Sequence, residues 1–505
     1  MIPDLLAGLQ AVFQLQVLFF LIAGVVLGLI FGALPGLTAT MGIAVLTPLT
    51  FWVSAEQGLA MLLGIYCGAI PGGGIPAILM NIPGTPASIA STWDGYPLSQ
   101  SGRAGLALGV NALFSLAGQW ISILFLAVAA FPIANFALRF GPAEYFGLAL
   151  FGISLMAGVS VGNATKGLLS GMLGLTLATV GLDPMTAFPR YTFGRSEFLD
   201  GISFIPVMIG LFGMAEVLSQ ISERHGQPQP LPQAMGRIWP GKSEWRQMSA
   251  PGLMGSAIGT LVGAIPAAGG DIASVIAWEQ SRRISKRKKE FGKGSLEGLA
   301  TTCAACNSAI GGAMTTMLTL GIPGDAPSAV LIGALLIHGL QPGPLLFRDR
   351  GDFIFTIVFI MLLAGLMVAI VGLAGAKPLA RTLRIPDPWL WSGILVFAIV
   401  GSYALNNSVT DVWVMFFAGL FGFLCRKGNI PLGPLVLGLI LGPMMESNLR
   451  RALILSRGDW TAVLSRPIVL FFLVATLLSL LWPFLRSASS LVKDKLRAKN
   501  SPPAH

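Results

Sequence analysis

The chain has 505 residues, of which 54% are hydrophobic and only 11% are charged. Soluble domains carry roughly 25% charged residues, so this composition excludes an ordinary soluble protein and indicates a membrane protein. The formal net charge is +10, yet the first Lys or Arg along the chain is Arg103.

Uncharged runs recur at the length of a membrane span. Residues 5–55 carry no charge, and further uncharged runs cover 104–138, 145–165, 298–324, 353–376, 388–410 and 467–485. About 20 apolar residues cross the hydrocarbon core, so we predict an all-α polytopic membrane protein with roughly ten to thirteen membrane segments. Residues 1–4 lack the positive region of a signal peptide, and we expect the first run to stay as an uncleaved span.

One unusual motif occurs twice. Asn81-Ile82-Pro83-Gly84-Thr85-Pro86-Ala87-Ser88 returns as Gly321-Ile322-Pro323-Gly324-Asp325-Ala326-Pro327-Ser328. A Pro-Gly pair interrupts a helix, and in lipid such a break is tolerated only where it faces protein or a water-filled cavity. Matched breaks in two halves of a chain are typical of a transporter binding site. We expect Gly84 and Gly324 to adopt the unusual backbone angles of these turns.

Other matches extend the duplication. The matched segments are Gly32-Ala33-Leu34-Pro35 with Gly263-Ala264-Ile265-Pro266, Asn163 with Asn407, and Gly171 and Gly174 with Gly419 and Gly422. Close helix packing explains any single glycine equally well, but the ordered set favours a duplication. We therefore predict a first membrane repeat over 1–222, a polar Pro/Gln-rich linker over 223–247, a second membrane repeat over 248–486 and a basic tail over 487–505.

Positive charge is concentrated in one loop. Its members are Arg282, Arg283, Lys286, Arg287, Lys288, Lys289 and Lys293. Nucleic acid or anionic lipid would attract such a loop, but the positive-inside rule is the simpler explanation and places the loop and the tail in the cytoplasm. The corresponding connection in the first half, residues 54–57, carries no positive charge, so we predict that the two repeats are inverted relative to each other.

Chemistry that makes or breaks bonds finds no support in the sequence. The three histidines, at 225, 338 and 505, are scattered, and Cys303-x-x-Cys306 has no second ligand pair for a metal. The Gly72-Gly73-Gly74 run lacks the Lys and Ser/Thr of a phosphate-binding loop. We expect no catalytic residue, no metal site and no organic cofactor.

Four segments carry a family resemblance. They are residues 32–40, residues 81–86 running on to Asp94-Gly95-Tyr96-Pro97-Leu98, residues 320–324, and Gly339-Leu340-Gln341-Pro342-Gly343-Pro344. Over about 15–485 the chain resembles the large membrane subunit of the tripartite tricarboxylate transporters, the TctA family. The resemblance implies a bacterial inner-membrane permease that imports citrate or another carboxylate with an ion gradient. It also implies two protein partners, a small membrane subunit and a periplasmic solute-binding protein. We expect no nucleic-acid partner, because the positive-inside rule accounts for the basic loop.

One segment departs from the family pattern. Where an acidic residue followed by Ala-Ala-Asn-Asn is expected, this chain has Cys303-Ala304-Ala305-Cys306-Asn307, and only Asn307 keeps its amide. The departure indicates a different substrate or ion ligand within the family.

The candidate site combines helix ends with neutral side chains. Helix N-termini present unpaired amides and about half a positive charge, which suits a carboxylate. The candidate substrate-binding residues are Pro35, Gly36, Thr38, Thr40, Asn81, Pro83, Gly84, Thr85, Ser88, Asn307, Pro323, Gly324 and Ser328. Asp271 and Asp325 are candidates for the coupling ion, with helix capping an open alternative.

The sequence leaves open the identity of the coupling ion and the class of the protein. Neutral oxygen ligands favour Na⁺ as the coupling ion over H⁺. The alternatives to a transporter are an intramembrane enzyme acting on lipid or peptide, which would need a base or metal among the spans, and a passive anion channel, which would need a continuous polar lining.

Overall fold

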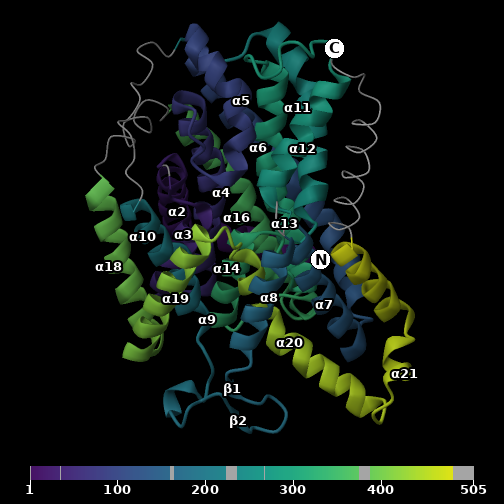
Figure 1. The fold of residues 1–505 in the computed structure, drawn as a ribbon. Coiled ribbons are helices and arrows are strands. Elements are labelled where there is room, and N and C mark those ends of the chain that lie inside the picture. The colour runs from purple at the N-terminus through teal and green to yellow at the C-terminus, as the bar shows by residue number, and fades with distance from the viewer. Residues whose placement is uncertain are drawn as a thin grey trace, which may run out of the picture. The chain divides into compact units, whose positions relative to one another are not determined.

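The computed structural model describes residues 2–34, 36–159, 164–222, 236–266, 268–374 and 387–481. In this part the fold is all-α, and the sheet it contains is one antiparallel pair, β1 (Gly181–Leu182) with β2 (Pro189–Arg190) (Figure 1). Pro35, Asn163, residues 223–235 of the predicted linker and the tail over 487–505 lie outside the described residues.

The chain forms two compact units. One comprises Met1–Arg139 with Ser203–Lys427, and the other comprises Phe140–Ile202 with Gly428–His505. Each unit contains residues of both predicted repeats. The units are defined by spatial contacts, whereas the repeats were predicted from matching sequence, so the two divisions need not coincide. The repeat boundaries therefore remain a prediction.

The larger unit holds most of the helices. In chain order they are α1 (Ile2–Val12), α2 (Leu15–Ala33), α3 (Ala39–Leu46), η1 (Thr47–Trp52), α4 (Ala55–Met80), η2 (Pro86–Ser88), α5 (Ile89–Leu98), η3 (Ser99–Arg103), α6 (Ala104–Ala137), α9 (Phe204–Met208), η5 (Ile209–Met214) and α10 (Ala215–Ser222). There follow α11 (Lys242–Gly263), α12 (Gly269–Ile284), α13 (Leu296–Leu320), α14 (Ala326–Ile337), α15 (Pro344–Asp349), α16 (Gly351–Ala374), α18 (Asp387–Asn406) and α19 (Val409–Lys427).

The smaller unit packs α20 against α7 and α8. Its elements are α7 (Pro142–Val159), α8 (Ala164–Ala178), the two strands, η4 (Ser196–Phe198), α20 (Gly433–Leu455), α21 (Trp460–Leu464) and a helix over Pro467–Leu481. The strand pair is tied to α20 by ion pairs, with Arg450 2.8 Å from Asp183 and Arg190 2.7 Å from Glu446. Hydrogen bonds from the Thr186 and Met185 amides lower the pKa of Asp183 to about 2.

Seven helices of the described part are long and apolar enough to cross a membrane. They are Leu15–Ala33, Ala55–Met80, Pro86–Ala137, Phe204–Ser222, Gly351–Ala374, Trp389–Asn406 and Val409–Lys427, and four shorter apolar helices lie at Ala39–Trp52, Pro142–Leu155, Ala326–Ile337 and Pro467–Leu481. The chain is thus an all-α polytopic protein whose long apolar helices are interleaved with short ones, as broken segments require.

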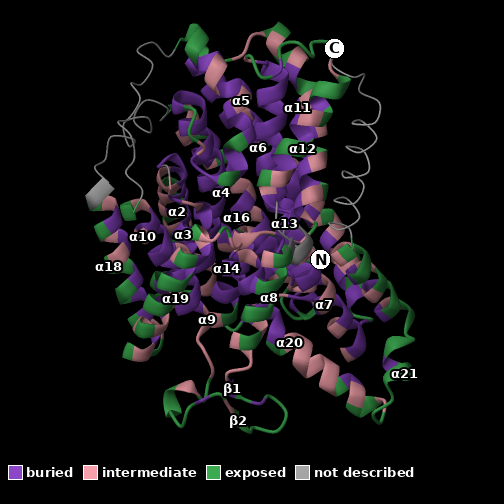
Figure 2. Ribbon diagram, in the orientation of Figure 1, coloured by how far each residue is buried: buried purple, intermediate pink, exposed green. Residues whose placement is uncertain are grey.

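Helices α4 and α13 form the core of the larger unit. Nearly every residue of each is buried, whereas α18 is exposed along much of its length (Figure 2). Because protein surrounds α13, its Thr, Ser, Cys and Asn side chains need no contact with lipid. This explains how α13 can be central although it is less apolar than the seven long helices.

Candidate transport site

Helix α2 approaches α4 through a row of glycines. A β-carbon placed on Gly24, Gly28 or Gly32 would lie 2.2, 2.5 and 2.1 Å from the carbonyl oxygens of Met61, Ile65 and Ala69, respectively. Real β-carbons do not come so close to an oxygen, so any side chain here would force the helices apart. The four-residue spacing puts all three glycines on one helix face.

Helices α11 and α13 meet in the same way. A β-carbon on Gly255, Gly259 or Gly263 would lie 2.5, 2.2 and 2.4 Å from the carbonyl oxygens of Thr301, Ala305 and Ala309. These glycines follow those of α2 by 231 residues, and the carbonyl oxygens follow those of α4 by 240 residues. The two helix pairs therefore use corresponding residues for corresponding contacts.

The first Pro-Gly motif ends α4 and turns the chain. Asn81 closes the helix with φ 59°, and the helix resumes at η2 and α5. The Gly84 amide donates to the Gly73 carbonyl at 3.2 Å, and a β-carbon on Gly84 would lie 2.1 Å from the Gly32 carbonyl oxygen. The motif thus folds back onto the glycine row.

The second motif repeats this arrangement at the end of α13. Gly321 closes the helix with φ 72°, and α14 begins at Ala326. A β-carbon on Gly324 would lie 2.6 Å from the Gly263 carbonyl oxygen. The expectation that Gly84 and Gly324 adopt unusual backbone angles is wrong. Positive φ occurs at Asn81 and Gly321, and the motif glycines are needed for close approach.

Both restarted helices are capped by a serine three residues after the N-cap. The Thr85 amide donates to Ser88 Oγ at 3.3 Å, and the Asp325 amide donates to Ser328 Oγ at 3.0 Å. Asp325 Oδ1 also accepts from the Ser328 amide at 3.0 Å. Capping is therefore an observed role of Asp325, and it leaves Oδ2 available.

A tyrosine takes up the second oxygen of Asp325. Tyr66, on α4, donates its hydroxyl to Asp325 Oδ2 at 2.5 Å. The bond joins the two broken segments across 259 residues of sequence. Reasoning from sequence missed Tyr66, although the 240-residue offset makes it the counterpart of Cys306, which was already singled out.

The start of α12 lies between the two breaks. A β-carbon on Gly270 would lie 3.2 Å from Ala87 Cβ, beside the first break. One on Gly269, whose φ is 61°, would lie 2.7 Å from Asp271 Oδ1 and 3.6 Å from Asp325 Cβ, beside the second. The structure thus brings Asp271 near Asp325, with Asp271 exposed.

Helix α3 packs against α14. Gly36 has φ 90°, Thr38 caps α3 by accepting from the Met41 amide at 3.2 Å, and Thr40 is buried. Gln220 covers the turn, since a β-carbon on Gly36 would lie 2.2 Å from Gln220 Nε2. Sequence analysis offered no signal for Gln220.

One of the candidate residues, Asn307, lies apart from the breaks. Asn307 turns its amide to α6, donating to Ser115 Oγ at 2.8 Å and to the Cys303 carbonyl at 2.8 Å. Asn81 is exposed at the end of α4. Pro83 is half-buried and Pro323 is buried within their turns.

A buried carboxylate fastens the first broken segment to the second half. Asp94, in α5, accepts from Trp278 Nε1 at 2.7 Å and from the amides of Gly292, Gly294 and Ser295 at 2.8, 3.2 and 2.8 Å. It is fully buried, so these four donors replace its hydration. We call this arrangement the Asp94 clasp.

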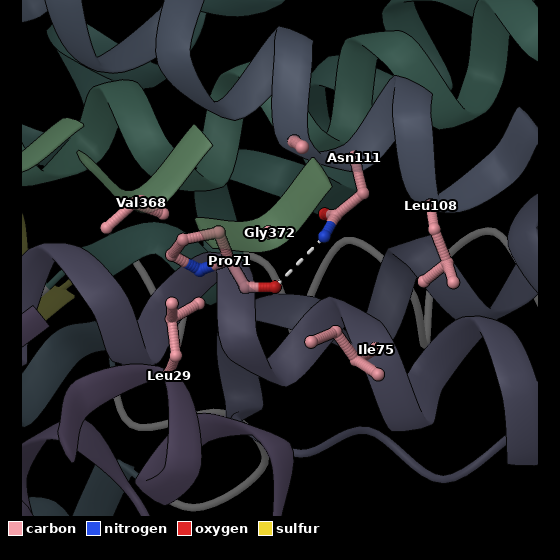
Figure 3. Close-up of a pocket in the computed structure, with 8 residues that line it drawn as sticks. Leu29, Pro71, Ile75, Leu108, Asn111, Val368 and Gly372 are labelled. Atoms are coloured by element: carbon pink, nitrogen blue, oxygen red, sulfur yellow. Dashed lines mark hydrogen bonds between the residues drawn. The ribbon is translucent and has the colours of Figure 1, made fainter. Parts of the chain in front are cut away.

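A small cavity lies beside α4. It is lined by Leu29, Pro71, Ile75, Leu108, Asn111, Ala112, Val368 and Gly372. Asn111 Nδ2 points across it to the Pro71 carbonyl, to which it donates at 3.0 Å (Figure 3). Its volume of about 20 Å³ suits one water molecule, so it offers no room for a carboxylate.

The remaining chemistry is that of binding. Among the described residues, no three His, Cys, Asp or Glu side chains gather as a metal site. Cys67, Cys303, Cys306 and Cys425 are all buried free thiols. The arrangement offers hydroxyls, amides and one capped carboxylate at two helix breaks.

Comparisons with known proteins identify the family of the chain. The model of the tripartite tricarboxylate transporter TctA family matches residues 18–437. The 52.8 kDa protein of the TAR-I ttuC' 3' region of Agrobacterium vitis is 36% identical over 467 residues, which are 92% of this chain and 93% of that protein. The protein of the TAR-II ttuC' 3' region of the same organism is 34% identical over 233 residues, 45% of this chain and 96% of that protein.

No solved structure matches the chain. The family match covers most of the sequence, including both Pro-Gly breaks, and the family is one of membrane transporters, not of enzymes. The chain therefore belongs to the tripartite tricarboxylate transporter TctA family.

Proposed function

We propose that this chain is the large permease subunit of a binding-protein-dependent secondary transporter. It imports a tricarboxylate or a related carboxylate across the bacterial inner membrane, driven by an ion gradient. Na⁺ is the favoured coupling ion and H⁺ the second choice.

The paired breaks carry this proposal. Each restarts a helix beside the buried helices α4 and α13, and a helix start offers amides without helical partners, which is a common way for proteins to bind anions. Gly32 and Gly263 bring the breaks against the glycine rows, and the Tyr66–Asp325 bond joins them. A carboxylate recognised by helix ends needs no paired cation, which fits a first half without Lys or Arg before Arg103.

We assign roles to the candidate residues on this basis. The substrate is bound by the segments around Gly36 and Thr38, around Gly84 and Thr85, and around Gly324 and Ser328. The coupling ion is bound by Asp325 and Asp271, whose proximity concentrates negative charge beside the second break.

Two partner subunits complete the transporter in this proposal. A periplasmic solute-binding protein delivers the substrate, and a small membrane subunit assembles with this chain. The family name, which specifies a tripartite transporter, supports this assignment.

Reconstitution in liposomes tests the proposal. Uptake of radiolabelled citrate and of a panel of other carboxylates is measured with and without the soluble binding protein, and in sodium or sodium-free buffer. We expect uptake at micromolar substrate only with the binding protein and an inward sodium gradient. Full-rate uptake without the soluble protein would contradict the tripartite assignment. Uptake that persists in sodium-free buffer but collapses with Asp325→Asn would favour protons.

The inverted arrangement of the repeats has its own test. Single cysteines at Ser54, which caps α4, and at Ser285, in the basic loop, are labelled in intact cells. We expect labelling from opposite sides, and labelling of both from one side would exclude inversion.

A further inference from the structure

The two breaks differ at the position that caps the restarted helix. Thr85 and Asp325 correspond under the 240-residue offset. Thr85 is 3% exposed, and its hydroxyl has no hydrogen-bond partner among the described residues. Asp325, in contrast, has one oxygen on the Ser328 amide and the other on the Tyr66 hydroxyl. One cap holds an unused donor, and the other holds a satisfied anion.

The residues that face the two caps differ as well, because only one of them bonds to its cap. Tyr66 reaches Asp325, whereas its counterpart Cys306 directs its thiol to the Cys303 carbonyl at 3.4 Å. No side chain of α13 therefore satisfies Thr85. The hydroxyl instead lies against the bare Cα of Gly73, where a β-carbon would be 2.5 Å from Thr85 Oγ1.

These differences set opposite electrostatic preferences. The helix that starts at η2 and continues through α5 has a neutral cap, so the partial positive charge of its first turn is uncompensated. At α14 the Asp325 carboxylate compensates that charge, and Asp271 adds a second negative charge nearby. An anion is attracted to the first break and repelled from the second.

We infer that the two breaks divide the ligands between them: a substrate carboxylate binds at the Thr85 break, and the Asp325 break is reserved for the coupling cation, with Tyr66 orienting the carboxylate. This assignment rests on the proposed function and removes the Ser328 side of the site from substrate contact. Because Thr85 is buried, the substrate reaches its hydroxyl when the break moves away from Gly73. A buried donor without an acceptor is costly, and a carboxylate oxygen is the acceptor it lacks.

Two variants, each expected to weaken the binding of one ligand and not of the other, test the inference. Thr85→Val removes the hydroxyl and keeps the shape, while Asp325→Asn removes the charge. Citrate or sodium is titrated into the purified protein by isothermal calorimetry, and the half-point, the concentration of each ligand at which half of the sites are filled, is measured. The substrate KM for uptake by the full transporter is measured alongside.

We expect Thr85→Val to raise the citrate half-point and the KM about 10- to 100-fold, the worth of one hydrogen bond to a charged group. Its sodium half-point should stay within about twofold. Asp325→Asn should shift the sodium half-point by a similar factor and leave the citrate half-point nearly unchanged. Tyr66→Phe, as a positioning change, should shift the sodium half-point by a smaller factor.

Two variants guard against a general loss of stability. Thr85→Ser restores the donor and should recover most of the citrate response. Thr356→Val, on α16, removes a buried hydroxyl that already donates to the Asp352 carbonyl at 3.0 Å, and should leave both half-points as they are.

Equal citrate half-points for Thr85→Val and the unaltered chain would overturn the inference, as would parallel loss of both responses in Asp325→Asn. Failure of the proposed function gives a different result: the unaltered transporter itself takes up neither citrate nor any carboxylate of the panel, and the inference then falls with it.

Discussion

The α2–α4 pair and the α11–α13 pair contact through the same row of glycines but carry different side chains next to it. Gly32 and Gly263 have the same role in their two pairs. In contrast, Tyr66 of the first copy corresponds to Cys306 of the second, and Thr85 corresponds to Asp325. Close helix packing depends on what is missing from a residue, so both copies need the same glycines. Ligand chemistry depends on what is present, and there the copies differ. The comparison separates residues that hold the core together from residues that give each break its own ligand.

The largest expected effect is the same in both pairs. Gly32→Ala and Gly263→Ala each gain about 1 kcal/mol in helix propensity, but their β-carbons would lie 2.1 and 2.4 Å from carbonyl oxygens. Overpacking against backbone costs about 3 kcal/mol, so both should sharply lower the yield of monodisperse protein. Gly393→Ala, on α18, meets nothing within 4 Å and should not reduce the yield. A large loss in only one of the two pairs would break the equivalence.

A smaller and unequal effect is expected where the chemistry differs. Tyr66→Phe removes a hydrogen bond to a half-buried carboxylate and should cost about 1.5–3 kcal/mol, while the corresponding Cys306→Ala should cost less because its thiol bond is weak. Thermal melting in detergent measures both. Equal losses would mean that Tyr66 contributes through packing alone.

Gly73 and Ala313 sharpen the comparison further. Gly73→Ala would place a β-carbon 2.8 Å from the Thr85 amide and 2.5 Å from its hydroxyl, and should cost about 1–2 kcal/mol with reduced uptake. The second copy already has alanine at the corresponding residue, so Ala313→Gly should lose about 1 kcal/mol and retain uptake. The prediction fails if Gly73→Ala transports normally per folded molecule.

The smallest effect is expected at the helix ends. Asn81 and Gly321 both have positive φ, at 59° and 72°, and Asn and Gly are the residues that tolerate it best. Exchanging them as Asn81→Gly and Gly321→Asn should change stability by less than about 1 kcal/mol. Valine at either position should lower stability by more than this. A valine substitution without effect on stability would show that the turn is free to rearrange.

Composition and motif spacing were sufficient to predict an all-α membrane protein with two helix breaks. The span count was harder to predict, because α13 is polar enough to fail as a span and is surrounded by protein instead of lipid. Sequence also could not tell which glycines are needed for close helix packing. A β-carbon on Gly171 would lie 3.7 Å from Pro434 Cβ, an ordinary contact, whereas one on Gly174 would lie 1.9 Å from the Leu435 carbonyl oxygen.

Only part of the candidate site could be predicted from the sequence. Restarted helices follow from Pro-Gly, but the partner of Asp325 could not be inferred from local sequence, since Tyr66 is 259 residues away and lies in an apolar run. Gln220 and Asp94 were missed as contacts for the same reason. Aligning the two copies at the 240-residue offset pairs Tyr66 with Cys306, but only the structure shows that Tyr66 contacts Asp325.

The Asp94 clasp has a mechanical consequence. It ties the helix after the first break to the connection that leads into α13, so the first broken segment cannot swing as an independent flap. Any displacement large enough to admit a ligand at one break must either strip four donors from a buried carboxylate or carry the α12–α13 connection along. The second course avoids the cost of an unsatisfied charge, and it makes movement at one break a movement of both.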